Sequence, residues 1–356
     1  MSHTAPILSV RHLTVGFRTD LGNVTAVGDV SFDLAAGKTL AIVGESGCGK
    51  TVTSKAIMRL LPERTARIDP QSEIILRDAE LGPIDLAKAS DTQMRDIRGA
   101  KIAMIFQEPM TSLNPVFRVG WQIEEALKYH TDLGGRQRRE RAIEMLRLVE
   151  IPSPEKRVDD YPHQLSGGMR QRVMIAIALC CEPAVLIADE PTTALDVTIQ
   201  AQILELMAGL KQKLGTAIIL ITHNLGVVAQ FCDDVMVMYA GRAIESAPIR
   251  ELFHHPRHPY TRALLDSIPK AGGRSGPEAR TSGSRKLPTI EGIVPSLYEL
   301  PKGCRFAERC GHRQELCVAK EPELAADGEG RRVRCHFPLM QPRVVRQVEP
   351  ALGGRP

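Results

Sequence analysis

The feature that most constrains the fold of this chain is a glycine-rich segment that ends in lysine and threonine. It fits the pattern GxxxxGK(S/T), which requires a preceding strand and a following helix. An apolar run at 39–43 has the composition of a buried strand, and the run at 52–60 has helical character. The sequence therefore predicts a phosphate-binding loop formed by Gly44, Glu45, Ser46, Gly47, Cys48, Gly49, Lys50 and Thr51.

The chemistry of phosphate binding explains this combination of residue types. Glycines allow backbone N–H groups to close around phosphate oxygens, and the N-terminus of the following helix adds a favourable potential for anions. Lys50 would reach the β- and γ-phosphates, and the hydroxyl of Thr51 would bind Mg2+. The alternative is an ordinary glycine-rich turn before a helix, and the flanking strand and helix make it the weaker interpretation.

Two adjacent carboxylates follow a second apolar run. Asp189 and Glu190 come directly after the run at 185–188, so a parallel sheet would place them at its carboxyl edge, where ligands bind. Asp189 would hold Mg2+ through water, and Glu190 would polarise the attacking water, because phosphoryl transfer needs mainly positioning and charge stabilisation. Taken alone, such a pair is more often a helix cap or a surface turn, so its meaning depends on other motifs.

Composition indicates an ordinary globular chain. Its 356 residues, 43% of them hydrophobic, suffice for two domains or for one large domain with an appendage. The net charge of +4 is too balanced to indicate a nucleic-acid partner. No secretion signal is visible, and no window reaches the roughly 18 consecutive apolar residues that a membrane span needs. We therefore expect a protein of the cytosol, or one held at a membrane by a partner.

The order of the expected elements predicts an α/β fold. Strands alternate with helices in the second half of the chain, as in a parallel or mixed sheet. Helical spacing of apolar residues dominates 107–164, where Trp121, Ile123 and Leu127 are expected to form a core. The expected strands are 8–17, 39–43, 185–188 and 217–221, and the expected helices include 170–181 and 197–214.

Four further motifs follow in order and carry a family resemblance. The sequence Leu-Ser-Gly-Gly-Met at 165–169 precedes a helical run, with Ser166 placed as its N-cap. This segment resembles the signature sequence of ABC ATPases. In the same way, Gln107 resembles the Q-loop of that family, Asp196 the D-loop and His223 the switch histidine. Six elements in this order and spacing make the chain similar to ABC ATPases over most of its length.

The resemblance implies a P-loop NTPase fold with a mixed or parallel sheet core, an antiparallel β subdomain and a helical subdomain. It also implies a head-to-tail dimer, in which the signature of one chain covers the ATP bound by the other. Each chain would then hold half of each composite site. The signature residues are Ser166, Gly167, Gly168 and Met169.

The same resemblance assigns roles at the ATP site. Phe17 takes the place of the aromatic residue that stacks on adenine, and Val52 joins the residues that bind ATP. Two sets of residues complete the site: Glu190, His223 and Gln107 as catalytic residues, and Thr51, Gln107 and Asp189 as the Mg2+ ligands.

Four longer stretches resemble the ATPases of dipeptide and oligopeptide importers, namely 107–115, 161–169, 189–202 and 257–261. This implies a subunit that couples ATP hydrolysis to uptake of dipeptides or oligopeptides across the bacterial inner membrane, bound peripherally on its cytoplasmic side. The partners it implies are a second, non-identical ABC ATPase, two transmembrane permeases and a substrate-binding protein, with no nucleic acid.

Other functions compete with this interpretation. Related importers carry nickel, opines or haem precursors. A non-transport ABC ATPase acting on nucleic acid would show a long coiled coil between the motif halves, or two ATPase domains, and the sequence shows neither. An inactive regulatory subunit would not need Lys50, Asp189, Glu190 and His223 intact.

The chain divides into four expected parts. An ABC ATPase domain covers 1–269 and contains a helical subdomain at about 108–165. A linker, poor in apolar residues and rich in glycine and serine, covers 270–287. A cysteine-rich peptide-importer domain follows at 288–340, and a tail at 341–356.

Half of the eight cysteines crowd into that C-terminal domain. Cys304, Cys310, Cys317 and Cys335 have five, six and seventeen residues between them. Four thiolates can bind zinc or an iron-sulfur cluster, and reduced thiols or disulfides are a third alternative. The same pattern occurs in peptide-importer ATPases, where it implies a structural 4Fe-4S cluster, with zinc as the alternative. Cys48 is a candidate reactive thiol, because it lies in an anion-attracting loop.

Overall fold

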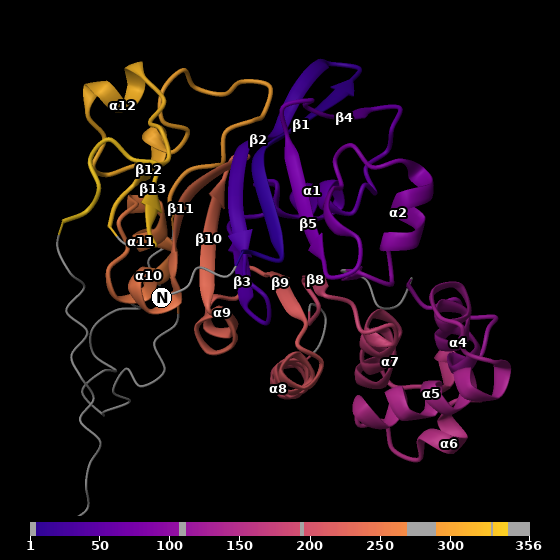
Figure 1. Cartoon of the computed structure of the whole chain (residues 1–356). Coiled ribbons are helices and arrows are strands. Elements are labelled where there is room, and N and C mark those ends of the chain that lie inside the picture. Colours follow the sequence, from indigo (N-terminus) through magenta and orange to yellow (C-terminus); the bar gives the residue numbers. More distant parts are fainter. Residues whose placement is uncertain (1–4, 107–111, 193–195, 269–289, 329, 341–356) are drawn as a thin grey trace, which may run out of the picture.

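A mixed eight-stranded sheet forms the centre of the fold (Figure 1). The computed structural model describes residues 5–106, 112–192, 196–268, 290–328 and 330–340. In order across the sheet, the strands are β12 (Ala325–Ala326), β13 (Arg332–Val333), β11 (Arg242–Pro248), β10 (Asp234–Tyr239), β3 (Thr39–Val43), β9 (Ala217–Ile221), β8 (Val185–Asp189) and β7 (Ile102–Ile105). The five from β10 to β7 are parallel, and the others pair antiparallel.

A second, antiparallel sheet lies beside the first (Figure 1). Its strands follow the order β2 (Gly22–Leu34), β1 (Leu8–Thr19), β5 (Glu73–Asp78) and β6 (Gly82–Asp85), and β4 (Ala66–Ile68) pairs with β1. β1 and β2 form a long hairpin in which Thr19 pairs with Gly22. The antiparallel β subdomain implied by the family resemblance is therefore present.

The central parallel strands are apolar on both faces because each face is covered. Successive side chains of a strand point to opposite sides. Ile42 and Ile219 accordingly belong to the core between the two sheets, whereas Val43 and Leu220 belong to the core under the helices. This double burial explains why β3, β8 and β9 appear in the sequence as uninterrupted apolar runs.

Helices cover both faces of the central sheet. On the side of the antiparallel sheet lie α1 (Lys50–Ile57) and α2 (Asp91–Ile97). On the other side lie α8 (Val197–Leu214), α9 (Leu225–Phe231), α10 (Ile249–His254) and α11 (Pro259–Asp266) (Figure 1). The predicted α/β fold is confirmed, and the helix expected over 197–214 has those bounds.

A group of helices lies at one end of the molecule (Figure 1). It contains α4 (Val119–His130), α5 (Gly135–Leu148), α6 (Pro154–Arg157), the 3-10 turn η1 (Pro162–Gln164) and α7 (Gly167–Leu179). Ile123 and Leu127 are buried in its core, as predicted. The prediction for Trp121 was wrong: its side chain is 43% exposed and stacks on Phe117, with ring centroids 4.0 Å apart. Helical spacing placed Trp121 near the apolar face of α4, but its ring lies at the edge of that face.

The C-terminal segment, which comprises residues 290–328 and 330–340, is joined to the central sheet. β13 pairs with β11, and the remaining short elements are η3 (Ala307–Arg309) and α12 (Glu315–Ala319). The fully buried carboxylate of Glu245 accepts hydrogen bonds from the backbone N–H groups of Arg257 and His258, at 2.8 and 2.9 Å. Arg257 in turn forms a two-pronged ion pair with Asp327. The Arg-His-Pro-Tyr-Thr stretch at 257–261 thus contributes the hydrogen bonds that fix the start of α11 and dock the segment.

Candidate functional site

The predicted phosphate-site residues meet at one edge of the central sheet. β3, β9 and β8 are adjacent and parallel, so their carboxyl ends lie side by side. The glycine-rich loop follows β3, Asp189 ends β8, and His223 follows β9. In open α/β sheets this carboxyl edge is where ligands bind.

The glycine-rich loop curls around the ammonium group of Lys50. The Nζ atom donates hydrogen bonds to the carbonyl oxygens of Gly44 and Glu45, at 2.9 and 3.0 Å, and the residue is buried. Gly49 takes a left-handed conformation, with φ 102°, directly before α1. A Cβ atom there would lie 2.8 Å from the carbonyl oxygen of Ala26, so this position requires glycine. The loop's own backbone and Lys50 therefore set its shape, and it ends at the N-terminus of α1, which favours an anion.

The hydroxyl and carboxylate expected to bind Mg2+ are already in contact. Thr51 Oγ1 donates to Asp189 Oδ1 at 3.2 Å, and Ser54 Oγ, which sequence analysis missed, approaches Oδ2 at 3.5 Å. Burial raises the pKa of the Asp189 carboxyl above its ordinary value, and the nearby Glu190 adds to this. A buried carboxylate beside a hydroxyl offers the hard oxygen donors that Mg2+ prefers.

Glu190 and His223 lie together at the same edge. Their side chains approach at 3.3 Å between Glu190 Oε1 and His223 Nδ1. The Glu190 backbone has φ 48°, an uncommon conformation for a residue with a side chain, and its N–H donates to the Ile221 carbonyl oxygen on β9. This bond ties the Glu190 backbone to β9 at the carboxyl edge of the sheet.

The Q-loop and D-loop predictions fare differently. Gln107 lies outside the described residues. β7, which leads to it, ends at the same sheet edge beside β8. Asp196 is described: it is the N-cap of α8, and its carboxylate accepts from the Ile199 N–H at 3.0 Å. A structural capping role for Asp196 is therefore present.

The signature segment begins a helix, as predicted. Ser166 is the N-cap of α7, and its Oγ accepts from the Met169 N–H at 3.3 Å. Gly167 is exposed, and a Cβ atom placed there would meet nothing within 4 Å. Figure 1 shows α7 among the helices at the end of the molecule, apart from α1. The start of this helix is thus exposed on the surface of the chain.

Comparison with known proteins agrees with these motifs. Residues 27–193 match the family model described as ABC transporter, and residues 244–317 match the one described as oligopeptide/dipeptide transporter, C-terminal region. A putative peptide import ATP-binding protein of Brucella ovis is 51% identical over 330 residues, covering 93% of this chain and 96% of its own. The chain belongs to the ABC transporter ATPase family. A probable peptide ABC transporter ATP-binding protein of Sinorhizobium fredii is 50% identical over 92% of this chain and 94% of its own.

Solved structures of ABC ATPases share the fold. A dimeric ATP-binding cassette bound to ADP and phosphate matches with a TM-score of 0.59 and 26% identity, covering 68% of this chain and 99% of its own. A cbiO1 subunit from Clostridium perfringens, part of an ABC transporter complex, matches with a TM-score of 0.58 and 28% identity over 70% of this chain and 91% of its own. As a member of the family, this chain is an ATP-binding, ATP-hydrolysing protein. Across its described residues, no helix combines the length and apolarity needed to cross a membrane.

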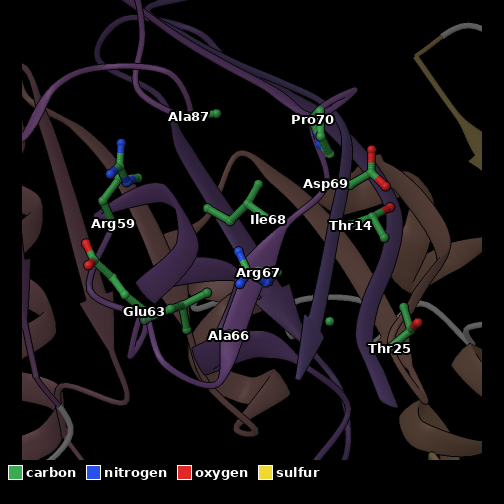
Figure 2. A pocket seen from close by; sticks show the side chains of 12 residues that line it. Thr14, Thr25, Arg59, Glu63, Ala66, Arg67, Ile68, Asp69, Pro70 and Ala87 are labelled. Carbon is green, nitrogen blue, oxygen red and sulfur yellow. The ribbon is translucent and has the colours of Figure 1, made fainter. Parts of the chain in front are cut away.

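Phe17 lies on β1 near an open hollow of the surface. It is half-buried against the core between the sheets, opposite Val24 and Ala66 on the neighbouring strands. Figure 2 shows side chains that line the hollow, among them Thr14 and Ala66, the cross-strand partner of Phe17. Phe17 itself is not one of the lining residues. Its stacking on adenine stays a prediction.

The structure adds detail on three further residues around the ATPase site. Cys48 is buried and burial raises the pKa of its thiol, so the prediction of a reactive thiol was wrong. Val52 is half-buried on α1 and packs against the core between the sheets. Gln171 on α7 was missed: its Nε2 donates to the Pro191 carbonyl oxygen, which links the signature helix to the segment after Glu190. A polar residue on a buried helix face was the available signal.

The four C-terminal cysteines line one small cavity of the ABC ATPase, together with His258 and Phe306. Burial raises the pKa of Cys304 and Cys310, and it raises that of Cys335 to about 11. In the described part of the chain, no group of three or more His, Cys, Asp or Glu side chains is placed to hold a metal ion. The structure therefore brings the predicted cysteines together around one space without arranging them as a metal site.

Proposed function

We propose that this ABC ATPase powers the import of dipeptides or oligopeptides. The observation that carries the proposal is the joining of an assembled ATP site to a C-terminal segment of the oligopeptide/dipeptide transporter type. Relatives at about half identity over nearly the whole chain bear names of peptide import proteins. Import of nickel, opines or haem precursors by the same machinery is the alternative.

Each residue of the site has a defined part in hydrolysis. Lys50 exchanges its bonds to the Gly44 and Glu45 carbonyls for phosphate oxygens, while the loop N–H groups bind the same anion. Thr51, Asp189 and Gln107 would hold Mg2+, which supplies charge neutralisation between the phosphates.

Glu190 and His223 act on the other side of the phosphate. The Glu190 carboxylate accepts a proton from the attacking water and directs that water at the γ-phosphate. His223 holds the carboxylate in position relative to the phosphate. We therefore assign proton transfer to Glu190 and orientation to His223.

A complete site requires a second ATPase. The exposed α7 start, with Ser166 as its cap, would cover the ATP bound by a second, non-identical ABC ATPase, whose own signature would cover the ATP at Lys50. Two solved relatives are described as dimeric, one of them bound to ADP and phosphate. Asp196, which caps α8, would complete the D-loop at this interface.

An exposed aromatic pair suits contact with the permeases. Phe117 and Trp121 stack on each other and are 37% and 43% exposed. They follow the Gln107 segment on the helical end of the molecule, so closure of the ATPase dimer would move this surface. We propose that two transmembrane permeases dock here from the inner membrane, that the chain lies peripherally on its cytoplasmic side, and that a substrate-binding protein delivers the peptide.

Co-purification with the tagged full-length chain tests this assignment. In mild detergent, we expect a second ABC ATPase and two permeases to accompany the chain. A peptide should be bound to the substrate-binding protein encoded with them, and mass spectrometry of that ligand identifies the cargo. A nickel ion, an opine or a haem precursor in place of the peptide would contradict peptide import while leaving the ATPase assignment intact.

We further propose that the four cysteines hold a structural 4Fe-4S cluster. The thiols fit such a group in kind and number, because all four border one cavity in the C-terminal segment. Four thiolates can bind either a 4Fe-4S cluster or zinc. The resemblance to peptide-importer ATPases favours the cluster, and zinc is the alternative. Bound, the cluster would stabilise a segment with little apolar core.

The cluster proposal predicts a metal content. Anaerobically purified chain is expected to be brown and to contain about four iron and four sulfide per molecule. Cys310→Ser should lower the iron content, whereas Cys232→Ser, a buried cysteine on another part of the fold, should leave it unchanged. Colourless protein with stoichiometric zinc would contradict the cluster.

A further inference from the structure

A salt bridge joins the C-terminal segment to the phosphate-binding loop. Arg309 presents its guanidinium to Glu45 with Nη1 at 2.8 Å from Oε2 and Nη2 at 3.1 Å from Oε1. The two residues are 264 positions apart in the sequence. The arginine side chain is only 6% exposed and the glutamate 25%. A two-pronged, largely buried pair of this kind is strong and geometrically specific.

The remaining donors of Arg309 are also used. Its Nη1 atom donates to the Tyr239 hydroxyl at 3.2 Å, and other nitrogens donate to the carbonyl oxygens of Ile290 and Glu291. The guanidinium also lies over the Tyr239 ring, 5.8 Å from its centroid. Because every prong has a partner, the arginine holds one orientation, and it fixes the carboxylate that it contacts.

Neighbouring contacts hold the same loop. The Glu45 N–H donates to the hydroxyl of the buried Tyr260 at 3.0 Å. The Tyr260 ring packs against Phe306 of the C-terminal segment, with centroids 5.3 Å apart. Arg305 donates to the Ala240 carbonyl oxygen.

The electrostatic consequence concerns the bound phosphates. Glu45 follows Gly44 in the loop, and both carbonyl oxygens contact Lys50. Without a cation beside it, the Glu45 carboxylate would repel the phosphates of ATP and would be free to turn toward Lys50. The buried arginine neutralises that carboxylate and holds it on the side facing the C-terminal segment.

We propose that Arg309 is a positioning residue for the phosphate-binding loop, through which the cysteine-rich segment sets the affinity for ATP. The inference rests on the proposed role of the loop in binding phosphate. Arg309 ends the η3 turn and directly precedes Cys310, which lines the four-cysteine cavity. Arg309 therefore connects the segment directly to the loop.

Equilibrium binding of a fluorescent ATP analogue to the full chain tests this role. Arg309→Met should weaken ATP binding by about tenfold or more, because a carboxylate is left unpaired beside the phosphates. Arg309→Lys keeps the charge without the two-pronged geometry, and it should raise the KM for ATP by about threefold with kcat retained in the assembled complex. Arg11→Met is the matched control, since Arg11 also makes a two-pronged pair, with Asp33, but lies on β1, outside the loop and the C-terminal segment. It should leave the affinity within about twofold of wild type.

A double substitution separates charge from general disruption. In Glu45→Gln with Arg309→Met the uncompensated charge is gone, so most of the lost affinity should return. Equal losses in the Arg309→Met and Arg11→Met variants, or no recovery in the double variant, would overturn the proposal. If Arg309→Met does not fold, the KM of Arg309→Lys decides: an unchanged KM overturns it. Wild-type chain that binds no ATP would instead refute the proposed site itself.

Discussion

Replacing Glu190 with glutamine is expected to lower ATP turnover of the assembled complex by about 100- to 1,000-fold while ATP binding persists. The amide has nearly the shape of the carboxylate, so the Glu190 backbone bond to Ile221 and the approach to His223 are retained. What is lost is the charge that accepts a proton from the attacking water. Phosphate release and binding of a fluorescent ATP analogue, measured on the same preparation, separate the two effects.

Glu182→Gln provides the control for this substitution. Glu182 lies on the surface after α7 and pairs with Arg141, with its side chain 56% exposed. Its loss should change turnover by less than about twofold, because surface ion pairs contribute little. If Glu190→Gln instead hydrolysed ATP at the wild-type rate, another group would have to activate the water, and the role assigned to Glu190 would be wrong.

The central part of the fold could be predicted because it is buried on both faces. β3 and β9 have the predicted bounds, and β8 extends one residue further, since a fully covered parallel strand is an uninterrupted apolar run. β5 and β6 were missed, because a half-exposed strand such as Glu73–Asp78 mixes charged and apolar residues without clear alternation. The two-residue strands β12 and β13 exist only through pairing with the central sheet, which no local pattern indicates.

The residues of the candidate site also differ in how well the sequence predicts them. The loop, Asp189 and Ser166 were predictable because their chemistry depends on neighbours within a few residues. The pairing of Arg309 with Glu45 and that of Gln171 with Pro191 join distant parts of the chain, so neither leaves a local pattern in the sequence. Local motifs thus identified the groups proposed to contact ATP, whereas the groups that hold them in place required the structure.

Substituting Lys50 by methionine is expected to weaken ATP binding by about 100-fold, which corresponds to about 2.8 kcal/mol at 1.4 kcal/mol per tenfold. The buried ammonium now bonds two loop carbonyls and is positioned to exchange them for phosphate oxygens. Methionine fills similar space but leaves both the carbonyls and the phosphates without their cation. Titration with the fluorescent ATP analogue measures the loss.

The matched control is Lys38→Met, because Lys38 precedes the same strand β3 at its opposite end. Lys38 pairs with Asp233 at the surface, where its side chain is 55% exposed, so its loss should leave ATP affinity within about twofold of wild type. A folded Lys50→Met chain that bound ATP as tightly as the Lys38 variant would place the phosphates elsewhere.

Glu45 bonds Lys50 through its carbonyl oxygen and Arg309 through its carboxylate. The effects of Arg309→Met and Lys50→Met on ATP affinity should therefore be non-additive. A measured coupling between the two substitutions is the result expected if one connected site extends from the cysteine-rich segment to the nucleotide.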